Sequence, residues 1–383
     1  MIEISRLEAR NFLLVKQGLI GPYQFRGKEG IMNFIDRTHM IQFDPVDLCG
    51  KNAQIVLHSR IEGFQKEMLD ELLYTDSELM EAYDKKLCIV DRNDWVRLAP
   101  VRWRKISRLK EPEGCWDAQN EILDLLAHEN TASVKSFTSH NRCKWYWGRD
   151  ASVYQIAFER LFAEGSICIS SRRGNTKQYR INELYSTMEY TLDDDYYKWH
   201  ILRRIESVGL LRCDPSPVWD YIPECTLKRR RNVIDELIEQ GEIEEVCVDT
   251  VDSHLYCAHK ELQYFDVDCS NLQKRVEFLA PLDNLLWDRK LLSDIFSFDY
   301  IWEIYIPEAK RQFCSYCQPI LWGNELVGRI ELKVEGTCLT VRNIWIERPV
   351  DRIFLLSLKE KLIRFAHFNS CISVNDTCID GCL

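Results

Sequence analysis

The segment from Ala157 to Ile181 reads AFERLFAEGSICISSRRGNTKQYRI, and it decides which fold class the chain adopts. Its residues up to Glu164 have the apolar spacing of an amphipathic helix, and Gly165 is the residue type that commonly ends one. An apolar run, Ile167–Ser170, then leads through a basic turn at Arg172–Asn175 into a second extended run, Gln178–Ile181. Helix, strand, basic turn and strand in this order are typical of a winged helix, so the segment predicts a DNA-binding unit.

The same pattern occurs again further along the chain. Val233–Gln240 has helical apolar spacing, and β-type runs follow at Glu242–Val248 and His254–Tyr256. A basic run, Lys228–Arg231, precedes this second copy. Helix, glycine and strand also occur in many other folds, but the basic segments favour two winged units in tandem. Each copy has a further helix before it, at Ala118–His128 and Tyr196–Val208.

The two ends of the chain differ in composition. The first hundred residues are mostly helical by periodicity, whereas from about Leu272 short β-like segments rich in aromatic residues dominate until a final amphipathic helix, Arg352–Phe368. The fold class expected is therefore α+β, with tandem winged-helix units followed by a C-terminal β-rich, barrel-like domain. The β segments expected there are Phe278–Ala280, Tyr300–Ile306, Phe313–Leu321, Leu326–Val334 and Cys338–Ile346.

Composition limits the class of protein. The chain has 383 residues, 46% of them hydrophobic, which is enough for several packed domains. It contains no apolar run of membrane-spanning length and no secretory signal, so we expect a cytoplasmic protein. Sixteen cysteines are scattered along it, and we expect reduced thiols. Cys314 and Cys317 form an isolated C-x-x-C, which by itself is too few ligands for structural zinc, and we expect no metal and no other cofactor.

The net charge of −10 argues against nucleic-acid binding only at first sight. Binding depends on the local potential, and the basic residues are clustered. Arg97–Lys110 contains six basic residues and no acidic one, and the turn at Arg172–Arg173 and the run Lys228–Arg231 add two more clusters. A single cluster is usually a solvated face, but clusters on winged-helix segments indicate a DNA footprint.

Gln42 and Asp44 are the residues that could carry chemistry. They lie in the segment Met40–Asp44, which alternates in polarity and ends at Pro45. In an extended segment residues two apart face the same side, so an amide and a carboxylate would lie together against the apolar Ile41 and Phe43. Aspartate before proline is also a frequent turn starter, and spacing alone does not decide between the two interpretations.

A resemblance to a known family favours the catalytic interpretation. Ile41–Ile61, IQFDPVDLCGKNAQIVLHSRI, and Phe278–Arg289, FLAPLDNLLWDR, resemble signature blocks of the bacterial winged-helix DNA glycosylases of the AlkZ and YcaQ (AlkX) type. Phe298–Tyr305, Pro319–Gly323 and Leu326–Arg329 are further matches, so the resemblance runs over nearly the whole chain. Gln42-Phe43-Asp44 is similar to the AlkX branch, whose motif is glutamine, an apolar residue and aspartate.

The resemblance implies a third winged unit at the N-terminus and an activity. We expect units at residues 1–110, 111–192 and 193–265, and a β-barrel-like domain at 266–383. The expected reaction is removal of cationic alkylated purines, including N7-linked bulky adducts or interstrand crosslinks, in base excision repair. Because such a base leaves without a proton, Asp44 would stabilise the sugar cation and take a proton from a water held by Gln42. No lysine lies inside the motif, so we expect no Schiff base, with nearby Lys51 as the alternative.

The partner implied is double-stranded DNA, bound by a monomer associated with the bacterial nucleoid. A non-catalytic winged-helix regulator is the alternative function, and the acidic residue at position 44 argues against it. A metal-dependent nuclease has little support, because Asp193–Asp195 fits a helix start better than a metal site. The residues expected to contact DNA are Lys51, Asn52, His58, Arg60, Arg172, Arg173, Lys177, Arg229 and Arg230.

Overall fold

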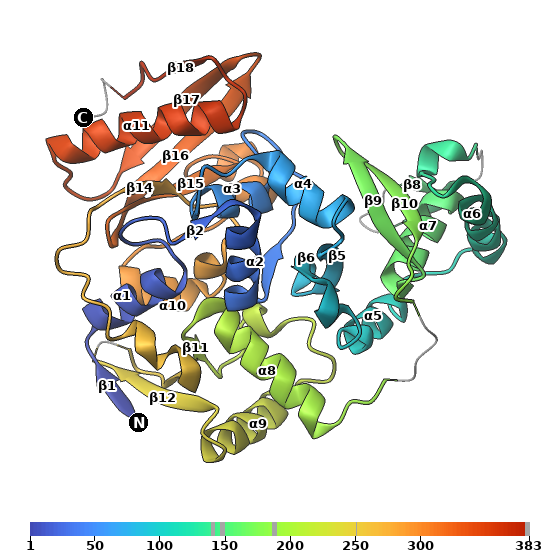
Figure 1. Cartoon of the computed structure of the whole chain (residues 1–383), viewed down its shortest axis with the longest axis horizontal. Coiled ribbons are helices and arrows are strands. Elements are labelled where there is room, and N and C mark those ends of the chain that lie inside the picture. The colour runs from blue at the N-terminus through green and yellow to red at the C-terminus, as the bar shows by residue number, and fades with distance from the viewer. Residues whose placement is uncertain (139–141, 146–149, 186–189, 250, 380–383) are drawn as a thin grey trace. The chain divides into compact units, whose positions relative to one another are not determined.

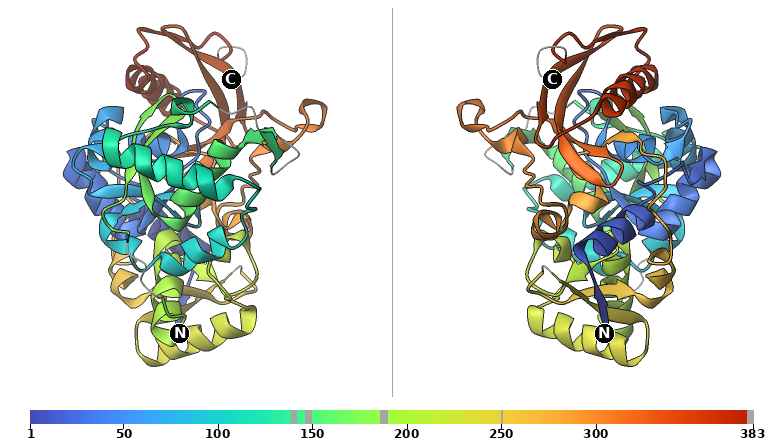
Figure 2. Two further views of the ribbon diagram at one scale, coloured as in Figure 1. Left: turned by 90° about the vertical axis from the view of Figure 1, so that its right-hand side faces the viewer. Right: turned by 90° about the vertical axis from the view of Figure 1, so that its left-hand side faces the viewer.

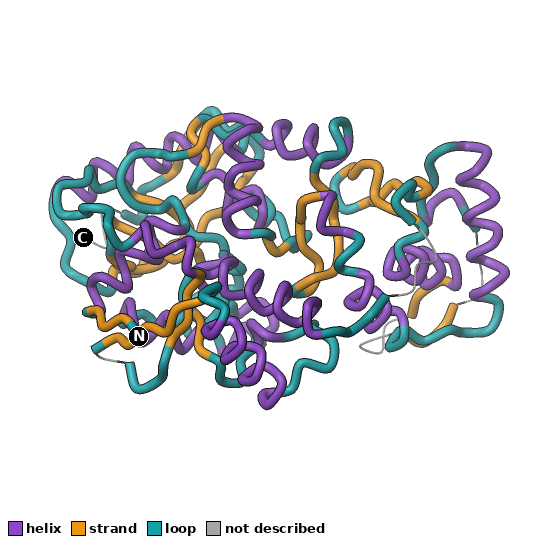
Figure 3. Tube along the Cα trace, turned by 60° about the horizontal axis from the view of Figure 1, so that its bottom comes forward, coloured by secondary structure: helices purple, strands orange, loops and turns teal. Residues whose placement is uncertain are grey.

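The structure is a computed structural model that describes all residues except 139–141, 146–149, 186–189, 250 and 380–383. Its contacts divide the chain into two compact units. The larger unit comprises residues 1–69, 197–220 and 225–383, and the smaller unit comprises residues 70–196 and 221–224. This division is coarser than the four units expected. Both units contain helices and strands (Figure 3), as expected for a mixed fold. Among the described residues, no helix is both long and apolar enough to cross a membrane.

The smaller unit contains the winged helix that its sequence predicts. Helices α6 (Cys115–Glu129) and α7 (Val153–Glu164) pack together, and strands β9 (Ile167–Arg173) and β10 (Thr176–Ile181) form the antiparallel wing beside them (Figure 1). Gly165 ends α7 with φ 103°, and a Cβ atom there would come within 2.6 Å of the Trp95 ring. Only glycine therefore combines this backbone conformation with so close a neighbour.

The remainder of the smaller unit contains two pairs of antiparallel strands and a helix that packs against α7. Strands β5 (Leu79–Asp84) and β6 (Lys86–Asp91) form a hairpin, β7 (Arg142–Lys144) and β8 (Asp150–Ser152) form another, and α5 (Ala99–Ile106) packs on α7.

The second winged helix lies in the larger unit. Helix α8 (Asp194–Val208), which enters this unit at Tyr197, is followed by β11 (Leu211–Arg212), α9 (Leu227–Glu239), β12 (Ile243–Val248) and β13 (Leu255–Ala258). The N-terminal strand β1 (Ile2–Ile4) pairs in parallel with β12 and completes the sheet order β1-β12-β13-β11. Figure 2 shows this strand at the N-terminus, leading into the first helix. The expected wing turn at 249–253 includes residue 250, which lies outside the described residues.

The N-terminal segment of the larger unit is helical, as expected. Its elements are α1 (Arg6–Lys16), β2 (Phe25–Arg26), α2 (Gly27–Thr38), β3 (Met40–Gln42), α3 (Asn52–His58), β4 (Ile61–Glu62) and α4 (Lys66–Tyr74), the last of which leaves this unit after Leu69. Ser5 and Glu8 form a capping box at the start of α1. The loop between β3 and α3 carries Asp44.

The C-terminal part of the larger unit is a curled five-stranded sheet with one helix packed against it (Figure 1). The sheet order is β14 (Val276–Phe278), β15 (Cys317–Trp322), β16 (Glu325–Glu335), β17 (Cys338–Ile346) and β18 (Ser373–Asn375). Helix α11 (Arg352–Phe368) has the bounds that periodicity predicts, and it buries Phe354, Leu358, Leu362 and Phe365. The tandem winged helices and β-rich C-terminal domain expected from the sequence are confirmed.

One strand expected in this domain is wrong. Tyr300–Ile306 is a loop with one 3-10 turn at Glu303–Tyr305, because the Glu303 carboxylate accepts hydrogen bonds from the backbone of Gln312 and Phe313. Tyr305, at the end of this turn, is 84% exposed. The sequence analysis also missed helix α10 (Arg289–Phe296).

Candidate active site

The motif Gln42-Phe43-Asp44 lies where strand β3 ends and a tight loop begins. Ile41 and Phe43 are buried, Gln42 is 6% exposed, and Asp44 is only partly buried. The backbone carbonyl of Gln42 accepts a hydrogen bond of 2.7 Å from the Asn52 side chain at the start of α3. A rigid apolar strand end therefore carries the carboxylate to a position between core and solvent.

Two carboxylates shape the loop after β3. Asp44 Oδ1 accepts a hydrogen bond of 2.9 Å from the Val46 amide, and Asp47 Oδ1 accepts one of 2.9 Å from the Gly50 amide. Asp44 is thus a turn starter as well as a candidate catalytic group. Among the described residues, its second oxygen has no hydrogen-bond or ion-pair partner. Burial raises the pKa of Asp44, and the hydrogen bond from Val46 opposes part of that shift.

The C-terminal sheet domain anchors the same loop. The Leu48 carbonyl accepts a hydrogen bond of 3.0 Å from the Val334 amide on β16, and the Cys49 carbonyl accepts one of 3.0 Å from the Asn369 side chain. The Gln318 amide on β15 lies 2.9 Å from the Cys49 sulfur. The position of Asp44 is therefore fixed by residues nearly 300 positions away in the chain.

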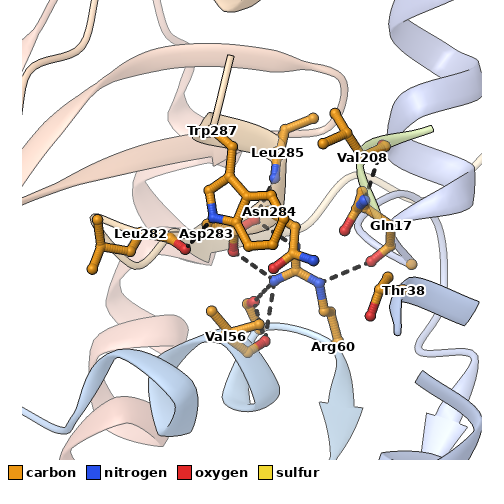
Figure 4. Close-up of polar contacts among 12 residues, drawn as sticks. Gln17, Thr38, Val56, Arg60, Val208, Leu282, Asp283, Asn284, Leu285 and Trp287 are labelled. Carbon is orange, nitrogen blue, oxygen red and sulfur yellow. Dashed lines mark hydrogen bonds and ion pairs between the residues drawn. The ribbon is translucent and has the colours of Figure 1, made fainter. Parts of the chain in front are cut away.

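Arg60 is the centre of a buried polar network, shown in Figure 4. Its guanidinium donates two hydrogen bonds of 2.8 Å to Asp283, and both side chains are 0% exposed. It also donates to the carbonyls of Gln17 and Val56 and to the Ser59 hydroxyl. Because protein groups occupy these donors, the expectation that Arg60 contacts DNA does not fit this structure. Asp283 additionally caps a 3-10 turn through the Leu285 amide, as a turn or cap residue would.

Asn52 and His58 are interior residues as well. Asn52 is 1% exposed, and its side chain joins the Gln42 carbonyl to the Leu282 amide, the latter over 2.9 Å. His58 is 5% exposed, and its Nδ1 lies 3.2 Å from the Lys361 ammonium. Burial and neighbouring cations lower the pKa of His58, so it stays neutral. Neither side chain is available to DNA here, whereas Lys51, at the N-terminus of α3, is partly exposed.

The basic wing of the smaller unit is divided between surface and interior. Arg173 is exposed at the turn. Arg172 forms a bidentate ion pair with Glu81, and only 5% of its side chain is exposed. The Lys177 ammonium lies 5.5 Å from the centre of the Phe162 ring, and burial lowers its pKa. Of these three expected DNA contacts, Arg173 is exposed and Lys177 is partly exposed, whereas the Arg172 side chain is held in its buried ion pair.

The basic run at the start of α9 also contains both exposed and buried side chains. Arg229 is exposed, although its guanidinium also donates a hydrogen bond of 2.8 Å to the Tyr197 hydroxyl. Arg230 is 3% exposed, and its guanidinium lies over the Trp219 ring and donates a hydrogen bond of 2.7 Å to the Cys213 carbonyl. The expected contact of Arg230 with DNA therefore does not fit this structure. Helical periodicity explains the difference, since successive residues point about 100° apart.

The smaller unit also contains a cavity of about 760 Å³ beside the basic helix α5. Arg104, Lys105 and Arg108 line one side, and Trp145 and Glu159 lie among the residues opposite. The Trp145 indole donates a hydrogen bond of 3.1 Å to Glu159. Half of the basic cluster at Arg97–Lys110 thus faces a cavity instead of a flat solvated surface.

The cysteines depart from expectation at one pair. Cys314 and Cys317 form a disulfide, where reduced thiols were expected. The cysteines described as free include the buried Cys49, whose pKa burial raises to about 12. Spacing in the sequence shows that Cys314 and Cys317 are close enough to pair, but their pairing depends on the turn that brings the two sulfurs together.

Sequence reasoning missed a group of buried polar residues in the C-terminal domain, one of which, Gln318, contacts the loop of Asp44 at Cys49. Tyr316 is 1% exposed, and its hydroxyl has no hydrogen-bond partner among the described residues. The Trp302 indole nitrogen and the Gln318 carbonyl oxygen are likewise buried without a described partner. Nothing in their local sequence marks them, because their burial follows from the packing of the domain.

Winged helices with exposed basic side chains are typical of DNA-binding proteins, and the half-buried carboxylate at the end of β3 is a candidate catalytic group. The profile of the family described as "DNA glycosylase AlkZ-like" matches residues 35–368. The chain therefore belongs to the AlkZ-like DNA glycosylase family and is a DNA glycosylase of DNA repair, with DNA as its substrate. This assignment sets aside the alternative of a non-catalytic regulator.

A solved structure has the same fold. The Streptomyces sahachiroi DNA glycosylase AlkZ is similar to this chain with a TM-score of 0.63 and 12% sequence identity. The similarity covers 98% of this chain and 99% of that chain. The architecture is therefore shared from end to end, although few residues are identical.

Proposed function

We propose that this chain hydrolyses the N-glycosidic bond of cationic alkylated purines in duplex DNA, with Asp44 and Gln42 as the catalytic pair. The observation that carries the proposal is the Asp44 carboxylate, which is half-buried, has one oxygen held by Val46 and has no described partner for the other. A buried carboxylate beside a developing sugar cation stabilises it more strongly than a solvated one.

The chemistry follows from the charge of the lesion. An N7-alkylated purine is already cationic, so the C1′–N9 bond breaks with its electron pair passing to the base and no acid is required. A water molecule then forms the new C1′–O bond, and Asp44 takes its proton. The raised pKa of Asp44 makes the carboxylate a stronger base than a solvated aspartate. The Gln42 amide would orient the water, and N7-linked bulky adducts and crosslinks are proposed as further substrates.

The proposed DNA contacts are limited to accessible basic side chains. Lys51, Arg173, Lys177 and Arg229 remain proposed phosphate contacts, since each is at least partly exposed. Arg60, Arg172 and the other buried residues described above are no longer proposed. We also propose that the protein acts as a monomer.

The test is excision of N7-methylguanine from duplex DNA under single-turnover conditions. Asp44→Asn is expected to lower the excision rate by about 100-fold or more, as loss of one preorganised electrostatic group does. Asp47→Asn is the matched control, because it changes an exposed carboxylate of the same loop and keeps the acceptor for Gly50. Both variants are expected to bind DNA with wild-type affinity. Wild-type turnover by Asp44→Asn would overturn the catalytic assignment.

The form of the product tests the hydrolytic mechanism. Simple hydrolysis leaves an abasic site that is cleaved only after alkali treatment. A Schiff base on Lys51 would instead be trapped by borohydride as a covalent protein–DNA adduct. We expect no adduct with wild type. An adduct that forms with wild type and is absent with Lys51→Met would show a lyase mechanism and contradict simple hydrolysis.

A further inference from the structure

A hollow of about 490 Å³ opens in the larger unit between the start of helix α4 and the end of helix α11. His58, the last residue of α3, lies at its floor, and residues 63–67 line it where the chain enters α4. The residues from α11 and just after it are Arg364, His367, Phe368 and Ser370. The catalytic proposal uses none of these residues, so the hollow is a separate feature of the molecule.

A buried N–H donor lies at the floor of this hollow. The Nδ1 of His58 lies 3.2 Å from the Lys361 ammonium, which also contacts the Glu277 carboxylate. An ammonium group only donates, so Nδ1 of the neutral imidazole accepts and Nε2 carries the proton. Among the described residues, Nε2 has no hydrogen-bond partner. Because His58 is only 5% exposed but lines the hollow, its N–H can reach a small ligand there.

The start of α4 adds backbone donors to the same hollow. Residues 63–67 line it one after another, and α4 begins at Lys66. The first turn of an α-helix leaves amide N–H groups without partners inside the helix, and the aligned peptide dipoles make this end positive. A helix N-terminus by itself is a common feature, but here a buried imidazole N–H lies at the same hollow. Two independent kinds of donor therefore meet in one space.

Two cationic side chains add positive charge. The Lys66 ammonium donates a hydrogen bond of 2.9 Å to the Asn369 side chain, which uses one of its three N–H groups. Arg364 is exposed, and its guanidinium lies 4.9 Å from the centre of the Tyr23 ring, without an ion-pair partner among the described residues. Glu67 is the acidic residue of the described lining, so positive charge exceeds negative charge. This balance favours an anion.

Contacts with the loop after β3 hold the hollow in shape. Asn369, which accepts from the ammonium, also donates a hydrogen bond of 3.0 Å to the Cys49 carbonyl. The Phe368 ring lies 4.6 Å from the His58 ring between centroids, and a Cβ atom at Gly50 would come within 3.0 Å of it. The donors are thus arranged before any ligand arrives, which lowers the entropic cost of binding one.

We propose that this hollow binds a phosphate group, carried by inorganic phosphate or by a mononucleotide. The Arg364 guanidinium and the Lys66 ammonium would neutralise its charge, and the His58 N–H and the first amides of α4 would donate to its oxygens. A tetrahedral anion accepts on several sides at once, which matches donors that come from three helices. The volume lies within the range of small-molecule sites and leaves room for a nucleoside. The depth of His58 favours such a small ligand over the backbone of a duplex.

Calorimetric titration of the full chain with inorganic phosphate, at constant ionic strength, tests the site. Arg364→Gln is expected to weaken binding by about 10-fold or more, as loss of a hydrogen bond between charged groups does. Arg352→Gln is the matched control, because it removes the same charge from an exposed position of the same helix outside the hollow. The control is expected to bind phosphate as wild type does. Equal affinities of all three proteins would overturn the proposal.

A second titration distinguishes the two sources of the phosphate group. Adenosine 5′-monophosphate that binds more tightly than inorganic phosphate would assign the hollow to a mononucleotide, and equal affinities would assign it to the free ion. Adenosine, which lacks the phosphate, is expected not to bind. If neither phosphate probe binds to wild type, the proposal is wrong.

The imidazole nitrogens report where the ligand lies. In protein labelled with ¹⁵N-histidine, the Nε2–H resonance of His58, assigned by its absence from His58→Gln, is expected to move when phosphate is added. At the same phosphate concentration it is expected to move less in Arg364→Gln than in Arg352→Gln. A resonance that stays in place while calorimetry records binding would put the anion elsewhere and contradict the proposal.

DNA is the remaining candidate for the anion. Arg364→Gln is expected to leave the slope of log duplex affinity against log salt concentration unchanged. A slope reduced by about 0.9, without binding of either phosphate probe, would assign Arg364 to the DNA backbone and overturn the small-ligand site. The inference is independent of the proposed glycosylase chemistry, because failure of wild type to release any alkylated purine would overturn that function and leave the phosphate titrations unaffected.

Discussion

Replacing Asp283 with leucine, with Arg60 left in place, is expected to destabilise the larger unit severely. The change leaves a guanidinium that is 0% exposed without its counter-ion and removes two hydrogen bonds of 2.8 Å. Removing one partner of a buried ion pair costs about 3–5 kcal/mol. At about 2–4 °C per kcal/mol for a unit of this size, the melting temperature should fall by roughly 6–20 °C.

Replacing both partners should cost less than the sum of the single changes. In Arg60→Met with Asp283→Leu no charge remains buried, and an apolar pair of similar volume often tolerates the exchange. Recovery is expected to be partial, because methionine leaves the Gln17 and Val56 carbonyls without their donor. Calorimetry on wild type, both single variants and the double variant measures the coupling. If the losses of unfolding free energy in the two single variants add up in the double variant, the conclusion that Arg60 and Asp283 neutralise each other's buried charge is refuted.

The double variant also tests whether Arg60 contacts DNA. A phosphate contact contributes about 0.9 to the slope of log affinity against log salt concentration. Because Arg60 is buried, the slope of the folded double variant is expected to equal that of wild type in fluorescence anisotropy titrations. A slope reduced by that amount would return Arg60 to the DNA interface.

Three further predictions concern charge. Arg173→Met is expected to reduce the slope of log DNA affinity against log salt concentration by about 0.9, because the Arg173 side chain is exposed at the wing. Arg172→Met is expected to leave this slope unchanged, because Arg172 is held in a buried ion pair. Equal slopes for the two variants would contradict this difference in exposure. Burial raises the pKa of Glu206, but hydrogen bonds, first that from His39, outweigh it and bring the pKa to about 2. Glu206→Gln should therefore be less stable than wild type at neutral pH, with the difference vanishing as pH falls from about 4.5 to about 2 in denaturation curves. Burial raises the pKa of Asp44, so its ionised form lowers the stability of the folded protein. Asp44→Asn is therefore expected to have a higher melting temperature than wild type at neutral pH and an equal one in acid. An unchanged melting temperature at neutral pH would contradict burial as the cause.

Local patterns along the chain were sufficient for much of the fold. Helical periodicity predicted α11 with the bounds observed, and the repeated helix, glycine and strand predicted the winged units around α7 and α9. The motif residues Gln42 and Asp44 were also found from sequence, through alternation and the family resemblance. These features depend on neighbours within a few residues, which periodicity and capping preferences describe directly.

Other properties depended on contacts between distant segments. Arg60 and Arg230 look like DNA contacts in sequence, but partners at Asp283 and Cys213 place them in the interior. Val334 and Asn369 carry no local sequence signal of such a role, and only the tertiary structure brings them into hydrogen bonds with Leu48 and Cys49 in the loop of Asp44. The physical reason is that exposure and the pKa of a group are set by what surrounds it in space, whereas periodicity reports only which face of its own element a residue occupies.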